Sequence, residues 1–230
     1  MSQQESDRDR INIAIDGPAG AGKSTVARMV AGKLNYVYID TGAMYRAVTF
    51  VAQRSGVEAN DTDALAQLVE QLHIVLEPGE NGQSVFVNDE DVTKHIRSRE
   101  VTLQVSHYAA QESVRSRLAK LQRDMAISKG VVMDGRDIGT HVLPDAELKV
   151  FLTASVQERA LRRYNEIKDS QSISLSQLEQ EIAERDALDE KRTIAPLIRA
   201  TDALLLDSTG KSIDEVVSEI VRLKNLVSSL

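Results

Sequence analysis

The feature that most constrains the fold is a glycine-rich stretch between an apolar run and a helical pattern. Residues 17–24 read GPAGAGKS and fit the pattern GxxxxGK[ST] in full. The β-branched run INIAID (11–16) precedes them, and a helical pattern from Lys23 to about Leu34 follows. A strand, a glycine loop and a helix in this order form the context in which such a loop binds phosphate groups.

Each part of this loop has a physical role in holding phosphate. The glycines let backbone N–H groups converge on one phosphate group, and the N-terminus of the following helix adds its positive dipole end. Lys23 is predicted to reach the β and γ phosphates, and the Ser24 hydroxyl to hold Mg²⁺. The predicted phosphate-binding residues are Gly17, Pro18, Ala19, Gly20, Ala21, Gly22, Lys23, Ser24 and Thr25. The loop predicts a nucleoside triphosphate ligand but leaves the reaction open.

Three classes of protein share such a loop: switch GTPases, ATP-driven motors and small-molecule kinases. A GTPase would need a guanine-selecting NKxD stretch, which the sequence lacks. A motor would need a chain longer than these 230 residues, with its own oligomerisation elements. Elimination leaves a kinase. The residues that would bind the molecule accepting the phosphoryl group must support that interpretation.

Five short apolar runs predict one parallel sheet. They are residues 11–16, 36–40, 131–134, 148–154 and 203–207, and helical patterns lie between them. Strands without polar alternation, joined through helices, are typical of a parallel sheet covered on both faces. The sequence therefore predicts an α/β fold of three layers around a five-stranded parallel sheet.

Two segments interrupt this pattern. Residues 73–93 hold two alternating runs around PGENG, with a turn candidate at Asn88-Asp89, and predict a small β-rich insertion over roughly 66–103. Polar helical patterns on both sides of KDSQSIS predict a helical lid over 160–192, mobile because few buried contacts would hold it down. Residues 11–65 and 104–230 form the predicted core, after a disordered tail at 1–10.

Composition excludes several classes of function. The net charge of −7 argues against a protein that binds an extended phosphate backbone, so no nucleic-acid partner is expected. The chain has no Cys, and its four His residues show no metal-ligand spacing. No apolar run reaches the length of about 20 residues that a membrane span needs. We expect a cytoplasmic protein without a membrane partner, and a monomer because no large apolar face stands out.

The stretch DTGAMYR (40–46) places a carboxylate, a hydroxyl and a guanidinium at the end of the second predicted strand. Ligands collect at the carboxyl ends of parallel strands, so Asp40 and Arg46 should lie beside the glycine loop. Thr41 and the helix N-terminus can bind an anion, and Arg46 can pair with two phosphate oxygens at once. The alternative is an ordinary helix cap followed by a surface arginine.

The stretch DGRDIG (134–139) follows the third predicted strand and carries three charges on one tight turn. Asp134 stands where a protein with this loop keeps the carboxylate that holds Mg²⁺ through water. Arg136 and Asp137 point into the same crevice, which suits a ligand with both a phosphate and a hydrogen-bond donor. Alternatively, Arg136 and Asp137 form a mutual surface ion pair of little energetic value.

Two helical segments contribute further charges. In ERDALDEKR (184–192), Arg185, Asp189 and Arg192 fall on one face of a predicted helix over 175–193. Cations over a bound triphosphate can stabilise a phosphoryl group in transfer, although both segments also fit the pattern of a solvated helix face. The arginines that share a face at the start of the predicted lid are Arg159, Arg162 and Arg163.

Four stretches of the sequence together resemble the bacterial cytidylate kinase family. They are IDGPAGAGKST, DTGAMYRA, DGRDIGT, and RD..D..R leading into APL..A.DALLLDST. The resemblance runs from about residue 11 to the C-terminus, with the motifs in the family's order. It implies a P-loop NTPase fold, ATP as phosphoryl donor with Mg²⁺, and CMP and dCMP as acceptors. It also implies that the β-rich insertion is part of an enlarged monophosphate-binding region. The specific motifs are DTGAMYR and DGRDIG, because the glycine loop alone is shared by many families.

The resemblance also implies roles for the residues at matching positions. The residues that would bind the acceptor phosphate are Thr41, Arg46, Arg136 and Arg192. Those that would bind cytosine are Ser106, Arg115 and Asp137, while Arg185 and Asp189 would meet the ribose hydroxyls and Asp40 completes the substrate-binding set. The expected catalytic cations are Lys23, Arg136, Arg192, Arg163 and Arg159, and the expected Mg²⁺ ligands are Ser24 and Asp134.

The sequence departs from the family's pattern in one place, and two other interpretations remain open. Lys168 is followed by Asp169 and Ser170, where the family often has a Lys-Gly pair, so the resemblance does not fix the conformation of the lid hinge. A P-loop kinase for a non-nucleotide acceptor, such as shikimate or a sugar, would leave the insertion and the arginines unexplained. A nucleotide-binding switch that signals through a partner is disfavoured by the missing guanine motif.

Overall fold

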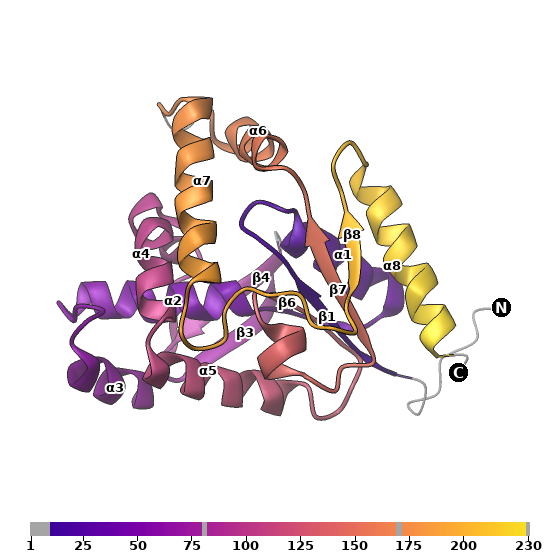
Figure 1. Cartoon of the computed structure of the whole chain (residues 1–230). Helices are drawn as coiled ribbons and strands as arrows, with labels where there is room; N and C mark the ends of the chain where they lie inside the picture. Colours follow the sequence, from indigo (N-terminus) through magenta and orange to yellow (C-terminus); the bar gives the residue numbers. More distant parts are fainter. Residues whose placement is uncertain (1–9, 80–81, 169–171, 229–230) are drawn as a thin grey trace.

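The computed structural model describes residues 10–79, 82–168 and 172–228. Within these ranges the chain forms a sheet between two layers of helices, with a second, smaller sheet beside it (Figure 1). The tail expected to be disordered lies outside the described residues except for Arg10, and so do Asp169 and Ser170 of the expected hinge. No helix in the described ranges is both long and apolar enough to cross a bilayer.

Five parallel strands form the main sheet in the order β2-β6-β1-β7-β8, which confirms the predicted architecture. β1 is central, in register with β6 from Asn12 opposite Val131 to Asp16 opposite Gly135. All five residues of β1 are buried, because the strand has neighbours on both edges and helices on both faces. The strands are β1 (Asn12–Asp16), β2 (Val37–Asp40), β6 (Val131–Gly135), β7 (Leu148–Thr153) and β8 (Leu204–Asp207).

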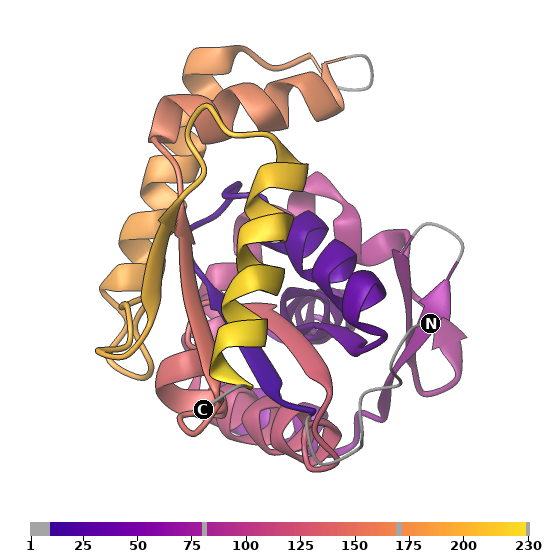
Figure 2. The ribbon, with the colours of Figure 1, turned by 90° about the vertical axis from the view of Figure 1, so that its right-hand side faces the viewer.

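Helices cover both faces of this sheet. The face that presents Ile13 and Ile15 packs against α1 and α8, which Figure 2 shows side by side. The opposite face, with Ala14 and Met133, packs against α5 and the short turn η3. Successive residues of β1 therefore enter different layers, as a strand with a two-residue period requires. The elements concerned are α1 (Lys23–Leu34), α5 (Glu112–Met125), η3 (Ile138–Val142) and α8 (Ile213–Val227).

The outer strand β8 departs from the predicted burial. Its sequence ALLLD reads as a strand buried on both faces, yet Leu204 and Leu205 are 45% and 56% exposed. β8 is the edge strand, paired in parallel with β7, so part of its surface faces solvent. Strand position in the sheet, which an apolar run does not encode, decides the burial here.

A three-stranded antiparallel sheet occupies the region predicted as a β-rich insertion. It packs on α2 through a shared apolar core that includes Met44, Val48 and Val85. Asn88 and Asp89 both have positive φ, 47° and 67°, which confirms a tight turn at the predicted place. The elements are α2 (Thr41–Arg54), α3 (Thr62–Glu70), β3 (Ile74–Gly79), β4 (Gly82–Val87), β5 (Glu90–Asp91), η2 (His95–Arg97) and α4 (Arg99–Ala109).

Two helices, α6 (Val156–Ile167) and α7 (Leu175–Glu190), stand over the carboxyl ends of the strands (Figure 1). They share a small apolar cluster of their own, built from Ala160, Ile167, Leu178 and Ile182. The prediction that one helix over 175–193 carries Arg192 is wrong, because α7 ends at Glu190. The N–H of Leu197 donates to the carbonyl of Asp189 over 2.9 Å, so the returning chain satisfies the helix end.

Candidate active site

A cleft of about 920 Å³ opens at the carboxyl ends of β2, β6 and β1, below α6 and α7. It is lined by the glycine loop from Ala19 to Thr25, by the start of α2, and by residues from α4 and α7. Every substrate-binding and catalytic residue expected from the sequence lines it, except Arg115 and Arg159. Gly17 and Pro18 of the loop do not line it either. The cleft thus brings together residues that lie far apart along the chain.

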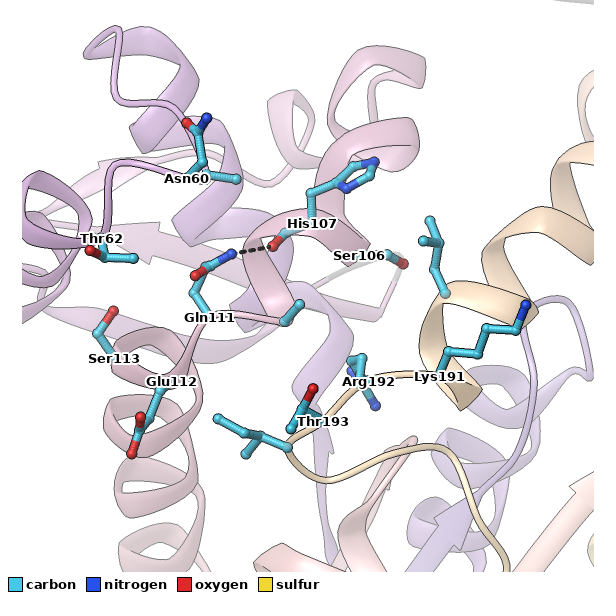
Figure 3. Close-up of a pocket in the computed structure, with 14 residues that line it drawn as sticks. Asn60, Thr62, Ser106, His107, Gln111, Glu112, Ser113, Lys191, Arg192 and Thr193 are labelled. Carbon is cyan, nitrogen blue, oxygen red and sulfur yellow. Dashed lines mark hydrogen bonds between the residues drawn. The ribbon is translucent and has the colours of Figure 1, made fainter.

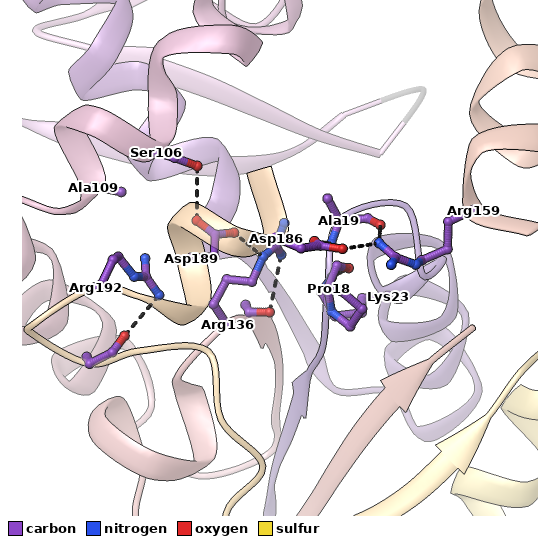
Figure 4. Close-up of polar contacts among 12 residues, drawn as sticks. Pro18, Ala19, Lys23, Ser106, Ala109, Arg136, Arg159, Asp186, Asp189 and Arg192 are labelled. Atoms are coloured by element: carbon purple, nitrogen blue, oxygen red, sulfur yellow. Dashed lines mark hydrogen bonds and ion pairs between the residues drawn. The ribbon is translucent and has the colours of Figure 1, made fainter. Parts of the chain in front are cut away.

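The backbone of the glycine loop requires its glycines. At Gly17 the φ angle is 149°, and a Cβ would meet the carbonyl oxygen of Leu152 at 1.9 Å. Gly22, the N-cap of α1, has φ 85° in the left-handed region, which favours glycine. The Lys23 Nζ turns back and donates to the carbonyl of Pro18 over 2.6 Å (Figure 4). Burial, and then the charge of Arg136, lower the pKa of Lys23 well below its usual range.

Asp134, at the end of β6, accepts hydrogen bonds from two hydroxyls. Ser24 Oγ donates to one carboxylate oxygen and Tyr38 Oη to the other, each over 2.9 Å. Burial, reinforced by the nearby Asp40, raises the pKa of Asp134 from 3.8 to about 6. Among the described residues no group of three or more His, Cys, Asp or Glu side chains could hold a metal ion. Mg²⁺ nevertheless fits this hydroxyl and carboxylate, since it usually takes one or two protein ligands plus phosphates and waters.

The residues of DTGAMYR adopt the capping arrangement as well as lining the cleft. Asp40 is the N-cap of α2, accepting from the N–H of Ala43 over 2.8 Å, and pairs with Arg46 over 3.1 Å. Thr41 Oγ1 donates to the backbone carbonyl of Asp134 over 2.6 Å, which ties α2 to β6. The Arg46 side chain remains 20% exposed, toward the cleft.

The alternative of a mutual ion pair between Arg136 and Asp137 is wrong. Arg136 Nε donates to Asp189 of α7 over 2.9 Å, and Asp137 pairs with Arg115 of α5. Ser106 Oγ donates to the other oxygen of Asp189 over 3.0 Å, so residues from α4, α7 and the turn after β6 meet there (Figure 4). Consecutive side chains at a strand end diverge, which is why adjacent charges in DGRDIG bind different partners.

The cleft carries an excess of positive charge. The Nε atoms of Arg46, Arg185 and Arg192 are buried and have no hydrogen-bond partner among the described residues. Burial, and then the charge of Arg136, lower the pKa of Arg185 to about 10. Burial, followed by Arg115, likewise lowers the pKa of Arg192. Cations that repel one another in this way indicate that the cleft binds an anion.

The three arginines predicted on one face of the lid have different environments. Arg159 is only 4% exposed and donates to the carbonyl of Ala19 and to Asp186 of α7. Arg162 donates to both oxygens of Ser208 and lies over the glycine loop, 3.8 Å from where a Cβ on Gly22 would be. Arg163 lines the cleft and pairs with Glu166 on the same helix. Arg159 therefore contacts the loop backbone instead of facing the cleft.

Sequence reasoning did not identify several residues that shape the site. Tyr38 lies two residues before Asp40 on β2, and a strand period of two could have placed it on the same side. Gln83 on β4 donates to the Tyr38 carbonyl and accepts from the Asp40 N–H, joining the second sheet to β2. Asp16 accepts from the N–H groups of Ile138 and Gly139 over 2.8 and 2.7 Å. Only the fold brings these groups together.

Asp16 leads to a testable dependence of stability on pH. Burial raises its pKa to about 6, although the amides of Gly139 and Ile138 oppose the shift. The folded state therefore holds this proton more tightly than the unfolded chain, and stability is lost as pH rises from 3.8 through 6. We expect the wild type to lose about 2.5 kcal/mol relative to Asp16→Asn between pH 4 and pH 7.5, measured by urea unfolding. An equal difference between the two proteins at both pH values would contradict this assignment.

A second hollow lies behind the acceptor end of the cleft (Figure 3). It lies between the end of α4, the start of α5 and the segment that follows α7. The residues that border both hollows are Ser106, His107, Leu188 and Arg192. The side chain of Gln111 donates to the carbonyl of His107 across its wall, although at 3.4 Å this contact is long. This hollow therefore adjoins the site and shares four of its residues.

A parallel sheet with a phosphate loop after its central strand and cations at the same edge defines a P-loop nucleotide-binding protein. Comparison with known proteins narrows this class. A family model for cytidylate kinase matches residues 13–226, and the chain belongs to that family. This confirms the resemblance carried by DTGAMYR and DGRDIG.

Individual relatives agree with the family match. The cytidylate kinase of Exiguobacterium sp. AT1b is 56% identical over 214 residues, covering 93% of this chain and 96% of that protein. The cytidylate kinase of Geobacillus sp. WCH70 is 54% identical over 219 residues, covering 95% and 98%. A solved structure of an uncharacterized protein from Eubacterium ventriosum superposes with a TM-score of 0.54 over 94% of this chain and 98% of that one. At 11% identity it shares the fold alone.

Proposed function

We propose that the protein transfers the γ-phosphoryl group of ATP to CMP or dCMP, giving ADP and CDP or dCDP. Family membership supports this reaction, and one structural observation carries it. Buried arginine nitrogens that have no hydrogen-bond partner in the described part of the chain lie in the same cleft as the phosphate loop. A phosphate monoester beside the triphosphate would balance that charge.

The chemistry needs no general base. The second pKa of a phosphate monoester is about 6, so near pH 7 the acceptor is mostly a dianion and already nucleophilic. The protein must instead align two anions that repel each other and balance the charge on the phosphoryl group in transfer. The acceptor phosphate is held by three guanidiniums, those of Arg46, Arg136 and Arg192. Thr41 and the N-terminus of α2 contribute to the same anion site.

On the donor side, Lys23 leaves the Pro18 carbonyl and binds the β and γ phosphates. Ser24 and Asp134 would hold Mg²⁺, which would supply positive charge to the phosphates of the donor. Arg163, with Arg162 beside it, adds cations from the lid. Arg159 acts from behind the loop, through its contact with Ala19.

Base selection follows from the chemistry of the buried ion pair. Cytosine offers an amino donor where uracil offers a carbonyl oxygen. Asp137, held by Arg115, accepts from that amino group and repels the uracil carbonyl. A site that leaves buried polar groups unpaired rejects the wrong base strongly, by several orders of magnitude in favourable cases. Arg185 and Asp189 bind the ribose hydroxyls.

Three parts of the chain divide these tasks. The core (11–65 and 104–230) holds ATP, the insertion (66–103) forms one wall of the monophosphate site, and the lid (160–192) excludes water during transfer. Gln83 and Gly82 of the insertion border the cleft, as do Arg185 and Asp189 of the lid. We further propose that one chain acts as a monomer, because one chain contributes every residue named here.

The test is a comparison of acceptors. Purified protein with Mg-ATP is incubated with CMP, dCMP, UMP, AMP, GMP, dTMP or shikimate, and ADP formation is followed. We expect CMP and dCMP to be used at least about a hundredfold better than UMP, since Asp137 meets a like-polarity oxygen in uracil. Turnover of shikimate alone would favour the non-nucleotide kinase, and slow hydrolysis without any acceptor would favour a nucleotide-binding switch.

A further inference from the structure

Three consecutive backbone groups of the glycine loop are each held by a side chain. The Pro18 carbonyl accepts from Lys23 over 2.6 Å, and the Ala19 N–H donates to Asp186 Oδ1 over 3.0 Å. The Ala19 carbonyl accepts from Arg159 Nη1 over 2.7 Å. Two of these three partners belong to the lid helices, so the loop is bound directly to α6 and α7 (Figure 4).

Asp186 and Arg159 form a closed ring with Ala19. Asp186 Oδ2 accepts from Arg159 Nη1 over 2.6 Å, and Arg159 Nε donates to the carbonyl of Ala154. Asp186 is 8% exposed and Arg159 is 4% exposed, so water does not compete strongly for these bonds. A buried, fully engaged carboxylate of this kind fixes one geometry of α7 relative to the loop.

The same helix reaches the acceptor end of the cleft. Asp189, three residues after Asp186, accepts from Ser106 and from Arg136. Arg185, the residue before Asp186, lines the cleft, and its buried Nε has no hydrogen-bond partner within the ranges that the structure describes. One rigid turn of α7 therefore contacts the phosphate loop with Asp186 and the acceptor side with Arg185 and Asp189.

We propose that Asp186 is a positioning residue that couples donor binding in the phosphate loop to acceptor binding through α7. When Lys23 leaves the Pro18 carbonyl for a phosphate, the Pro18-Ala19 peptide is released on one side only. Asp186 still holds the N–H of that peptide, and Arg159 holds the carbonyl of the following Ala19-Gly20 peptide. Any shift of the loop backbone here therefore moves α7, with Arg185 and Asp189. A bound donor then orders the acceptor residues, and donor and acceptor bind with positive cooperativity. The inference rests on the proposed function for the identity of the two ligands.

The test measures the coupling by calorimetry. The Kd of CMP is determined alone and with saturating Mg²⁺ and adenylyl imidodiphosphate, which resists transfer. We expect the wild type to bind CMP about tenfold more tightly with the donor analogue present. In Asp186→Asn the ratio should fall below about twofold, because one of the two acceptor oxygens becomes a donor amide, while the Kd of CMP alone changes by less than about threefold.

Two further variants separate positioning from folding. Arg159→Gln combined with Asp186→Asn removes both buried charges and leaves neither unpaired, so it should fold and also lose the coupling. Glu190→Gln is the matched control, because Glu190 is the exposed last residue of α7 and does not line the cleft. Its coupling should equal that of the wild type, and thermal unfolding verifies the fold of each variant.

A wild-type ratio below about twofold, or an undiminished ratio in Asp186→Asn, would overturn the coupling. Phosphorylation of CMP by the wild type is measured in parallel. If CMP is phosphorylated but the ratio is near one, the positioning role fails and the proposed function stands. If CMP is not phosphorylated by an intact protein, the proposed function fails instead.

Discussion

Replacing Lys23 with alanine is expected to lower the turnover of CMP by at least about a hundredfold, the scale of removing one preorganised charge-stabilising donor. The buried ammonium group is the loop's side-chain cation, and in this structure it is held only 2.6 Å from the Pro18 carbonyl. Alanine retains helix propensity at the first position of α1, so the fold should be kept. ADP formation with CMP and Mg-ATP measures the effect, and circular dichroism monitors the fold.

The matched control is Lys33→Ala, which removes the same charge from the last turn of the same helix. Lys33 is exposed and lies outside the cleft, so its variant should retain turnover within about twofold of the wild type. Near-normal turnover in a folded Lys23→Ala protein would remove Lys23 from the proposed mechanism.

The second large effect concerns the buried pair of Arg115 and Asp137. Arg115 is 1% exposed, donates to the Ala109 carbonyl over 3.1 Å and lies over the ring of Tyr45. Arg115→Met leaves the Asp137 carboxylate buried without its cation, which costs about 3 to 5 kcal/mol of stability. For a chain of this length we expect the unfolding midpoint to fall by about 10 °C, measured by thermal denaturation at pH 7.5.

Two controls identify the unpaired charge as the cause. Arg115→Met combined with Asp137→Leu removes both charges and should recover at least about half of the lost stability. Arg54→Met breaks the pair with Glu90, in which both side chains are 47% exposed, and should cost less than about 1 kcal/mol. A double variant no more stable than Arg115→Met would show that packing of the arginine stem, and not charge, dominates.

Comparison of the sequence with the structure shows which features a linear pattern can encode. The strands, the parallel sheet and the tight turn at Asn88-Asp89 follow from residue periodicity and turn chemistry, and the structure has them. The end of α7 was not predictable, because a contact from Leu197 to the Asp189 carbonyl terminates it. The helix propensity of the local sequence does not encode a hydrogen bond to a segment that returns from further along the chain.

In the candidate site, too, some features could be predicted from the sequence and others could not. Three motifs predict phosphate binding from the sequence alone, because this chemistry requires glycines, hydroxyls and guanidiniums at short spacings. They are GPAGAGKS, DTGAMYR and DGRDIG. Their pairings could not be read from those motifs. Arg136 binds Asp189 and Asp137 binds Arg115, although Arg136 and Asp137 are neighbours in sequence. Arg159, expected over the phosphates, instead lies behind the loop on Ala19 and Asp186.

By itself the sequence determined the fold class, the phosphate loop, the family and the set of charged residues that reach the cleft. Only the tertiary structure decided which charge meets which partner, how deeply each is buried, and that α7 touches both ends of the cleft. The physical reason is that motifs encode local backbone geometry and functional groups within a few residues. Ion pairing and desolvation depend instead on distances across the fold, between segments as far apart as Ala19 and Asp186.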